Sequence, residues 1–171
     1  MNFKERLAEK KSAILKAWYD AALAIPAGRF PDFLEKQNAL IADVMGYSLA
    51  EGLDGLFDAL LRGVIPDDVS RFLDSMIRLR AVNDFKASQA VAFIAEVKKI
   101  VRKELGNEVL SDPFLREELT TWEAAVDDLV LFAFDIYVRY REKILEQQTN
   151  EAKNETLRLL KKAKLIPDDQ E

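Results

Sequence analysis

The stretch that decides the fold runs from Ser111 to Tyr140 and reads SDPFLREELTTWEAAVDDLVLFAFDIYVRY. It opens with Ser-Asp-Pro, which is typical of a helix start, because a short polar side chain caps the first turn and proline fits the first helical position. Apolar residues follow mostly at helical steps: Leu115, Leu119, Trp122, Val126, Leu129, Phe132, Phe134 and Tyr137. We expect this helix to lie centrally in a bundle, with that surface buried.

The chain before this stretch repeats the same pattern between helix breakers. Apolar spacing predicts helices over residues 2–25, 38–62, 66–81 and 89–105, with a short helical turn over 32–36. The breaks contain Pro26, Gly28, Pro31, Gly63 and Gly106–Asn107. Asn38 is the expected cap of the second long helix, and Asp84 or Ser88 that of the fourth.

Three glycines fall inside the second predicted helix. Gly46, Gly52 and Gly55 follow no strand and form no Walker or dinucleotide-binding pattern, so we do not expect a phosphate site. Gly52, Gly55 and Ala59 instead form a small-residue stripe. We expect another helix to approach closely there.

The length and composition fit one helical domain. The 171 residues are 49% hydrophobic and include only 6 glycines and 5 prolines. We predict an all-α, single-domain bundle of about six or seven helices over residues 1–171, for which a globin-like arrangement is one option. After Tyr140, a C-terminal extension over about 141–166 either continues as one long helix or bends near Asn150.

The composition also excludes several classes of function. The chain has no His and no Cys, which removes zinc fingers, Ser-His-Asp triads, Cys-His proteases and disulfide frameworks. A net charge of -5 does not favour nucleic-acid or anionic-lipid binding. No apolar run is long enough for a membrane span, and the N-terminus does not resemble a signal peptide. We therefore expect a cytoplasmic protein without nucleic-acid or membrane partners.

Carboxylates are the main acid–base groups that this composition leaves. Five of them crowd the first part of the helix after Pro113, namely Glu117, Glu118, Glu123, Asp127 and Asp128. A hydrolase that uses Glu123 and Asp127 with a divalent ion is the lowest-ranked hypothesis, because no second helix supplies matching ligands. We expect no metal site and no enzymatic activity.

Asp135 interrupts an apolar run, so we expect it to be buried with a cationic partner. Arg139 lies four residues on, in the favourable order for an ion pair, and Arg78 or Arg80 could reach it from another helix. A structural ion pair and a ligand-sensing site are both open interpretations.

Five segments of the chain together resemble a known family. They are Gly46–Gly52 (GYSLAEG), Arg78–Ala90 (RLRAVNDFKASQA), Ala133–Tyr137 (AFDIY), Arg141–Lys143 (REK) and Asn150–Lys153 (NEAK). In this respect the sequence resembles the RsbRD N-terminal domain family over nearly its whole length. Arg78–Ala90 is the most specific segment, because helix patterning alone does not require its order of charges, aromatic residue and Ser-Gln.

The resemblance implies a sensory or regulatory domain related to the RsbR-type scaffolds of bacterial stressosomes. No output module follows Glu171 in this sequence, so we expect a stand-alone domain with a signalling partner such as a kinase or a stressosome-like component. RsbR-type domains resemble globins, but without histidine we expect no haem and no other cofactor. The candidate ligand or interaction residues are Tyr47, Arg78, Arg80, Asp84, Gln89, Asp135 and Arg139.

The C-terminal extension supplies a route for partner contact. Leu145, Thr149, Ala152, Thr156, Leu159, Ala163 and Ile166 follow the four-and-three spacing of a narrow helical seam, which indicates either a homodimer contact or a helix lying on its own core. The alternative function is a small-molecule-binding bundle, with an apolar pocket formed by Phe93, Trp122, Phe132 and Phe134.

Overall fold

The computed structural model describes residues 2–24, 36, 39–43 and 46–167. Within these residues the secondary structure is helical, with no strand, so the predicted all-α class is confirmed. The named helices are α1 (Phe3–Leu23), α3 (Leu49–Arg62), α4 (Asp67–Val82), α5 (Ala87–Ser111) and α6 (Pro113–Lys162). No helix in the described ranges is both long and apolar enough to cross a bilayer.

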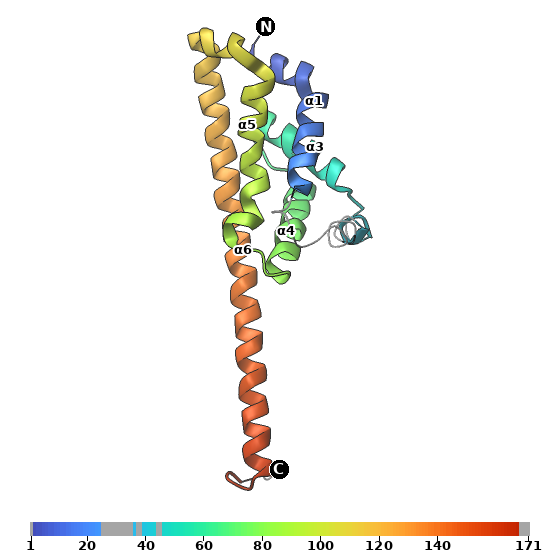
Figure 1. The fold of residues 1–171 in the computed structure, drawn as a ribbon, viewed down its shortest axis with the longest axis vertical. Coiled ribbons are helices and arrows are strands. Elements are labelled where there is room, and N and C mark those ends of the chain that lie inside the picture. Colours follow the sequence, from blue (N-terminus) through green and yellow to red (C-terminus); the bar gives the residue numbers. More distant parts are fainter. Residues whose placement is uncertain (1, 25–35, 37–38, 44–45, 168–171) are drawn as a thin grey trace.

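Helix α6 contacts all four of the other named helices, but the prediction that its whole apolar surface is buried is wrong, because Phe132 and Phe134 are exposed. The first half of α6 lies against α5 and α4, and α1 packs on α5 and α3 (Figure 1). The core side chains come from all five helices and include Trp18, Phe57, Phe72, Ile94 and Val126. Trp18 is fully buried, and its indole N–H donates to the Phe93 carbonyl of α5 at 2.7 Å.

The second long helix is shorter than the sequence predicts. Gly46 adopts a left-handed φ of 66°, which interrupts the helical backbone, and Ser48 caps α3 through a reciprocal hydrogen-bond pair with Glu51. The prediction of one helix over 38–62, with Gly46 inside it, is therefore wrong. Residues 39–43 are helical, and the proposed cap Asn38 lies outside the described residues.

The small-residue stripe of α3 does allow a close approach. A Cβ added at Gly52 would lie 2.2 Å from the Phe72 ring of α4, and one at Gly55 would lie 2.9 Å from Val69. Both glycines thus let α4 pack closer than alanine would allow. The prediction of close helix approach is confirmed.

The turn before α5 is capped differently from the prediction. The backbone N–H of Lys86 donates to the Gln89 side-chain oxygen at 3.0 Å, and α5 begins at Ala87. Neither Asp84 nor Ser88 is the cap, because Asp84 lies in the turn with a positive φ and Ser88 is already helical. At its other end α5 kinks at Gly106, where the helix was predicted to end.

Helix α6 settles the question of the C-terminal extension. It is one helix of 50 residues from Pro113 to Lys162, without a bend at Asn150, and at 1.5 Å per residue it is about 75 Å long. Asp112 caps it by accepting from the Phe114 N–H at 2.9 Å. Residues 142–162 project beyond the bundle and are mostly exposed (Figure 1).

Candidate functional site

Arg80 is the most deeply buried charged side chain of the described residues. It lies on α4 with 3% of its surface exposed. Its Nη1 donates to the carbonyls of Gln89 (3.2 Å) and Ala90 (3.3 Å), and its Nη2 donates to the Ala22 carbonyl (3.2 Å). The guanidinium therefore ties the end of α1 to the start of α5.

The charge of Arg80 has no carboxylate to balance it within the described residues. Its guanidinium lies 4.5 Å from the centre of the Phe93 ring and 5.7 Å from that of Phe85, and its Nε has no hydrogen-bond partner in the described part of the chain. Burial lowers the pKa of Arg80 to about 10. The side chain remains cationic at neutral pH, stabilised by carbonyl dipoles and aromatic faces.

A cavity of about 420 Å³ lies beside this guanidinium. Phe85 and Phe93 give it apolar walls, and Ser88 and Gln89 add polar groups at the start of α5. The remaining lining is Ala21, Ala22, Ala24, Arg80, Ala92 and Glu96. The predicted candidates Arg80 and Gln89 thus meet at one cavity.

Arg78 and Arg139 meet elsewhere, in a groove between α4 and α6. The groove has a volume of about 510 Å³, and its lining also includes Arg71, Asp74 and Phe132. Asp74 accepts from the Tyr140 hydroxyl at 2.6 Å and lies 3.8 Å from the Arg139 guanidinium. Burial and this hydrogen bond raise the pKa of Tyr140.

Tyr47 and Asp84 take part in separate helix contacts. The Tyr47 hydroxyl donates to Asp68 at 2.8 Å, which raises the pKa of Tyr47 and lowers that of Asp68. Asp84 accepts from Arg141 at 2.9 Å and is largely exposed. The predicted site residues therefore do not form one constellation.

The burial predicted for Asp135 is wrong. Its side chain is exposed, because α6 turns its core face through Ala133, Ile136 and Tyr137 and leaves the intervening positions outside. Arg139 faces Asp74 instead, and Arg80 is occupied by the carbonyls at the ends of α1 and α5.

The prediction that four aromatic side chains line one apolar pocket is also wrong. Phe93 lines the Arg80 cavity, Trp122 lines a cavity of about 400 Å³ near Phe3, and Phe132 borders the α4–α6 groove. Phe132 and Phe134 are each 41% exposed. These four aromatic side chains lie at different heights of the bundle and on different helix faces. Helical periodicity does not show how such side chains are placed relative to one another.

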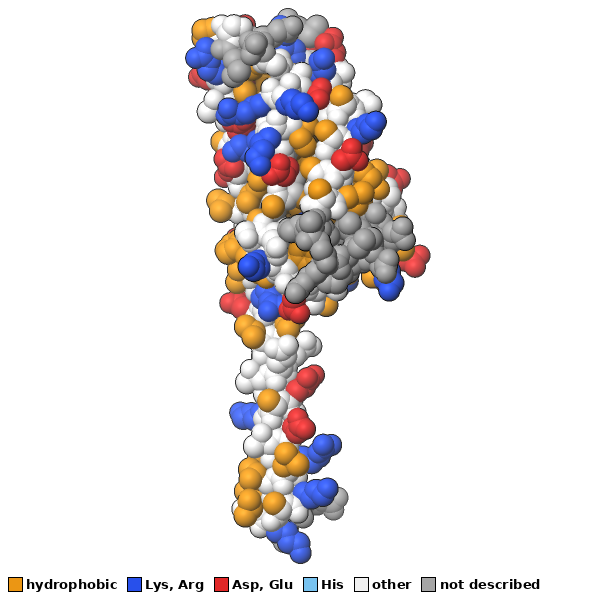
Figure 2. Space-filling view, viewed as in Figure 1, with side chains coloured by type: hydrophobic (Ala, Val, Ile, Leu, Met, Phe, Trp, Pro, Cys, Tyr) orange, Lys and Arg blue, Asp and Glu red, His pale blue; other side chains and the backbone are white. Residues whose placement is uncertain are grey.

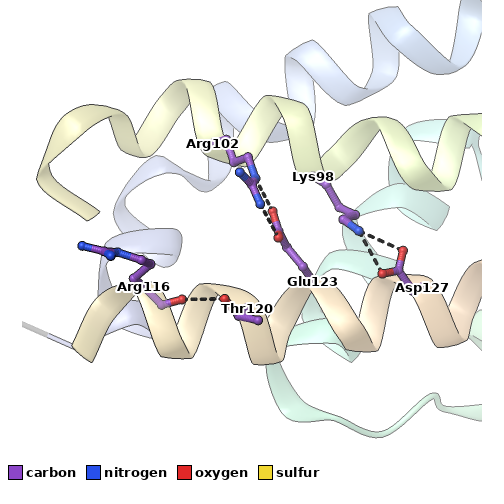
Figure 3. Close-up of polar contacts among 6 residues, drawn as sticks. All are labelled: Lys98, Arg102, Arg116, Thr120, Glu123 and Asp127. Carbon is purple, nitrogen blue, oxygen red and sulfur yellow. Dashed lines mark hydrogen bonds and ion pairs between the residues drawn. The ribbon is translucent and has the colours of Figure 1, made fainter. Parts of the chain in front are cut away.

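The acidic residues proposed for a metal-dependent hydrolase are held in ion pairs. Glu123 is buried and receives two hydrogen bonds from Arg102 of α5, at 2.5 and 2.7 Å (Figure 3). The two carboxylate oxygens of Asp127 accept hydrogen bonds from the Lys98 ammonium group, both at 2.9 Å (Figure 3). In the part of the chain that is described, no group of three or more acidic side chains is placed to hold a metal ion.

An apolar stripe runs along the face of α6 that points away from the core. Its members recur at steps of three, four and seven residues: Leu131, Phe134, Val138, Leu145, Thr149, Ala152, Thr156 and Leu159. Leu131, Leu145 and Leu159 are 63%, 55% and 56% exposed. Figure 2 shows apolar side chains both on the bundle and near the far end of the projecting helix.

The stripe differs from the seam predicted from sequence at both ends. Lys164 has a positive φ and α6 ends at Lys162, so Ile166 lies beyond the helix and Ala163 only caps it. The hydroxyls of Thr149 and Thr156 donate to the carbonyls four residues earlier, both at 2.8 Å, which satisfies their polar atoms within the helix.

Comparison with known protein families found a match that covers most of the chain. The family model described as the RsbT co-antagonist protein rsbRD N-terminal domain matches residues 13–152. The chain belongs to this family. The match takes in Arg80 with its cavity and the first part of the projecting half of α6.

Membership of the RsbRD N-terminal family makes this a regulatory domain of stress-response signalling. The family is involved in partner-switching stress signalling, which suggests protein partners. No curated protein and no solved structure matches the chain.

Sequence reasoning on this RsbRD-type domain missed two features. Leu131, Phe134 and Val138 extend the projecting seam over the bundle, and their spacing from Leu145 could have revealed it. The contact of Arg80 with the end of α1 could not be found, since 58 residues separate it from Ala22.

Proposed function

We propose that this domain regulates signalling by protein contact along the apolar stripe of α6, and that two copies of the chain associate there. The observation that carries the proposal is the projecting half of α6, whose apolar side chains have no core to cover. The proposed function involves no catalytic step and no cofactor. The proposed location is the cytoplasm.

A helix without a packing surface is a weak structure in water. Most of the stability of a protein helix comes from packing its apolar face, and short isolated helices are only marginally stable. Residues 142–162 extend for about 30 Å with little support from the bundle. A partner laid along the stripe supplies the missing surface.

A second copy fits the spacing of the stripe. Alternating steps of four and three from Leu145 to Leu159 are those of a two-stranded coiled coil, in which each apolar side chain inserts between side chains of the facing helix. Ala152 and the methyl groups of Thr149 and Thr156 contribute less than leucine would. We therefore expect a reversible, moderate association, as suits a regulatory switch.

Light scattering after size-exclusion chromatography tests the proposal. We expect a mass that rises with concentration toward twice that of the monomer. The variant Leu145→Lys/Leu159→Lys should stay monomeric, because it places charges in the stripe. Both side chains are exposed in one copy, so the fold of the monomer should not change.

Leu157→Lys is the matched control. Leu157 is 44% exposed on the same projecting helix but lies beside the stripe, so this variant should associate like the unchanged protein. A monomer at every concentration would contradict self-association, and so would equal loss of association in Leu157→Lys and Leu145→Lys/Leu159→Lys.

The α4–α6 groove favours a second contact, with a signalling protein such as a kinase or a stressosome-like component. Arg71, Arg78 and Arg139 line it against a single carboxylate, Asp74. This excess of guanidinium groups suits an acidic segment. Arg71→Glu/Arg78→Glu should abolish capture of a partner without changing self-association, and unchanged capture would rule out this groove.

A further inference from the structure

We propose that the cavity beside Arg80 binds a small organic monocarboxylate with an apolar body. This rests on the proposed regulatory function and adds to it the chemical class of a ligand that the domain would sense. It rests on a different part of the molecule from the apolar stripe.

The first argument is the charge of Arg80. An arginine that is 3% exposed normally pairs with a carboxylate, because a buried charge is costly without one. Among the residues that the structure describes, Arg80 meets only three carbonyl oxygens and two aromatic rings. A bound anion would balance the charge.

The second argument is the make-up of the cavity wall. Phe85 and Phe93 flank the guanidinium and offer apolar faces to a ligand body. Gln89 uses its side-chain oxygen to cap α5, which leaves its amide N–H groups for an acceptor on a ligand. The Ser88 hydroxyl, one position earlier, adds another donor.

The charge balance selects a single negative charge. Among the described residues of the lining, Arg80 is the one cation, and Glu96 disfavours a highly charged ligand. Glu96 is itself paired with Lys99 at 2.7 Å, so it does not neutralise Arg80. One carboxylate therefore fits better than a phosphate, and the volume of about 420 Å³ admits a small apolar body with it.

The site also has a route to the rest of the domain. Arg80 holds the end of α1 to the start of α5, and Phe93, whose carbonyl accepts from Trp18, lies in the cavity wall. A carboxylate that binds the guanidinium would compete with the hydrogen bonds by which Arg80 connects these two helices. Because α5 packs along α6, this contact leads toward the stripe.

Isothermal titration calorimetry on the full chain tests the proposal, with benzoate and octanoate as probes. Benzamide and octanamide are the uncharged controls. We expect at least one carboxylate to bind at millimolar concentration or below, and its amide to bind roughly tenfold or more weakly. Absence of binding by both carboxylates, or equal binding of acid and amide, would overturn the proposal.

Two variants locate the binding without removing Arg80. Gln89→Glu keeps the cap of α5 and adds a competing negative charge, and Ala92→Leu fills the cavity from an exposed helical position. Each variant should bind the carboxylate probe roughly tenfold more weakly than the unchanged protein does. Ala13→Leu, at an exposed position of α1 away from the lining, should leave affinity unchanged.

Other results separate this proposal from the stripe. Folding of each variant is checked by circular dichroism, and unchanged affinity in both Gln89→Glu and Ala92→Leu would place the binding elsewhere. Leu145→Lys/Leu159→Lys should still bind the carboxylate. A monomeric protein that binds it would contradict self-association alone, and a dimer that binds no carboxylate would contradict the cavity alone.

Discussion

Two glycines of α3 set the distance between α3 and α4. The absence of a side chain at Gly52 makes room for the Phe72 ring, and Gly55 does the same for Val69. Glycine weakens a helix by about 1 kcal/mol relative to alanine, so its use at both positions indicates that packing outweighs helix propensity here.

Gly52→Ala should lower the free energy of unfolding by about 1–3 kcal/mol, because overpacking exceeds the gain in helix propensity. Gly55→Ala should cost less, since its nearest contact is 2.9 Å rather than 2.2 Å. Urea denaturation measures both. In the Gly52→Ala background, Phe72→Leu should cost less than it does alone, and simple additivity of the two changes would contradict the packing account.

The ion pairs between α5 and α6 differ in burial, and so should their effects. Arg102→Met leaves the buried Glu123 carboxylate without its partner, whereas Lys98→Met breaks an exposed pair with Asp127. Exposed pairs are worth under about 1 kcal/mol. Chemical denaturation should therefore show a clearly larger loss for Arg102→Met, and equal losses would contradict a structural role for Glu123.

The absence of histidine and cysteine makes a further prediction about haem. The usual proximal ligands are missing, and only Met and Tyr side chains remain as candidates. Protein purified from cells grown with a haem precursor should therefore show no Soret absorbance. A strong band that persists through purification would contradict the expected absence of a cofactor.

At the scale of elements, α6 serves two purposes with two faces. Its core face, which includes Val126, Ala133 and Ile136, is continuous with the bundle, while the stripe from Leu131 to Leu159 points away from it. Tyr140 lies near the point where the bundle ends and anchors α6 to Asp74 of α4. Contacts of this kind hold the projecting half in place relative to the bundle.

Tyr140→Phe should change how stability depends on alkaline pH. The pKa of Tyr140 is raised above 10 by burial and by its bond to Asp74, so the folded chain holds this proton more tightly than the unfolded chain. Its contribution is complete below about pH 10 and is lost as the pH rises through the folded-state pKa. The stability difference between the unchanged protein and Tyr140→Phe should therefore shrink above pH 10.

Urea denaturation across that range measures this difference. Asp74→Asn should reproduce the behaviour of Tyr140→Phe, because it removes the charged acceptor of the same bond. A difference that stays constant, or grows, with rising pH would contradict the assigned contact.

The sequence predicted the ends of most helices well, but it predicted less well which face of each helix meets the core. Breakers such as Gly63 and Pro66, and the Asp112–Pro113 start, mark helix ends through local chemistry that acts within a few residues. Asp135 and Phe134 were expected inside because the run around them is uniformly apolar, and such a run does not show which face meets the core. Arg80 depends on contacts between distant helices, which periodicity does not contain.

At the scale of the whole molecule, the two proposed sites lie in different places. The Arg80 cavity is formed by α1, α4 and α5 within the bundle, whereas the stripe extends along α6 into the projecting half. Figure 1 shows that this half extends beyond the other helices of the bundle. A signal from cavity to stripe would pass through the packed α5–α6 pair.

Hydrogen exchange of the projecting half tests the central claim most directly. If a second copy covers the stripe, amides from Leu145 to Lys162 should exchange slowly in concentrated protein and much faster after roughly hundredfold dilution. Amides of the bundle core, such as those of Ile94 and Val97, should not change. Rapid exchange of residues 145–162 at every concentration, with the core still protected, would contradict the proposal that this helix is the contact surface.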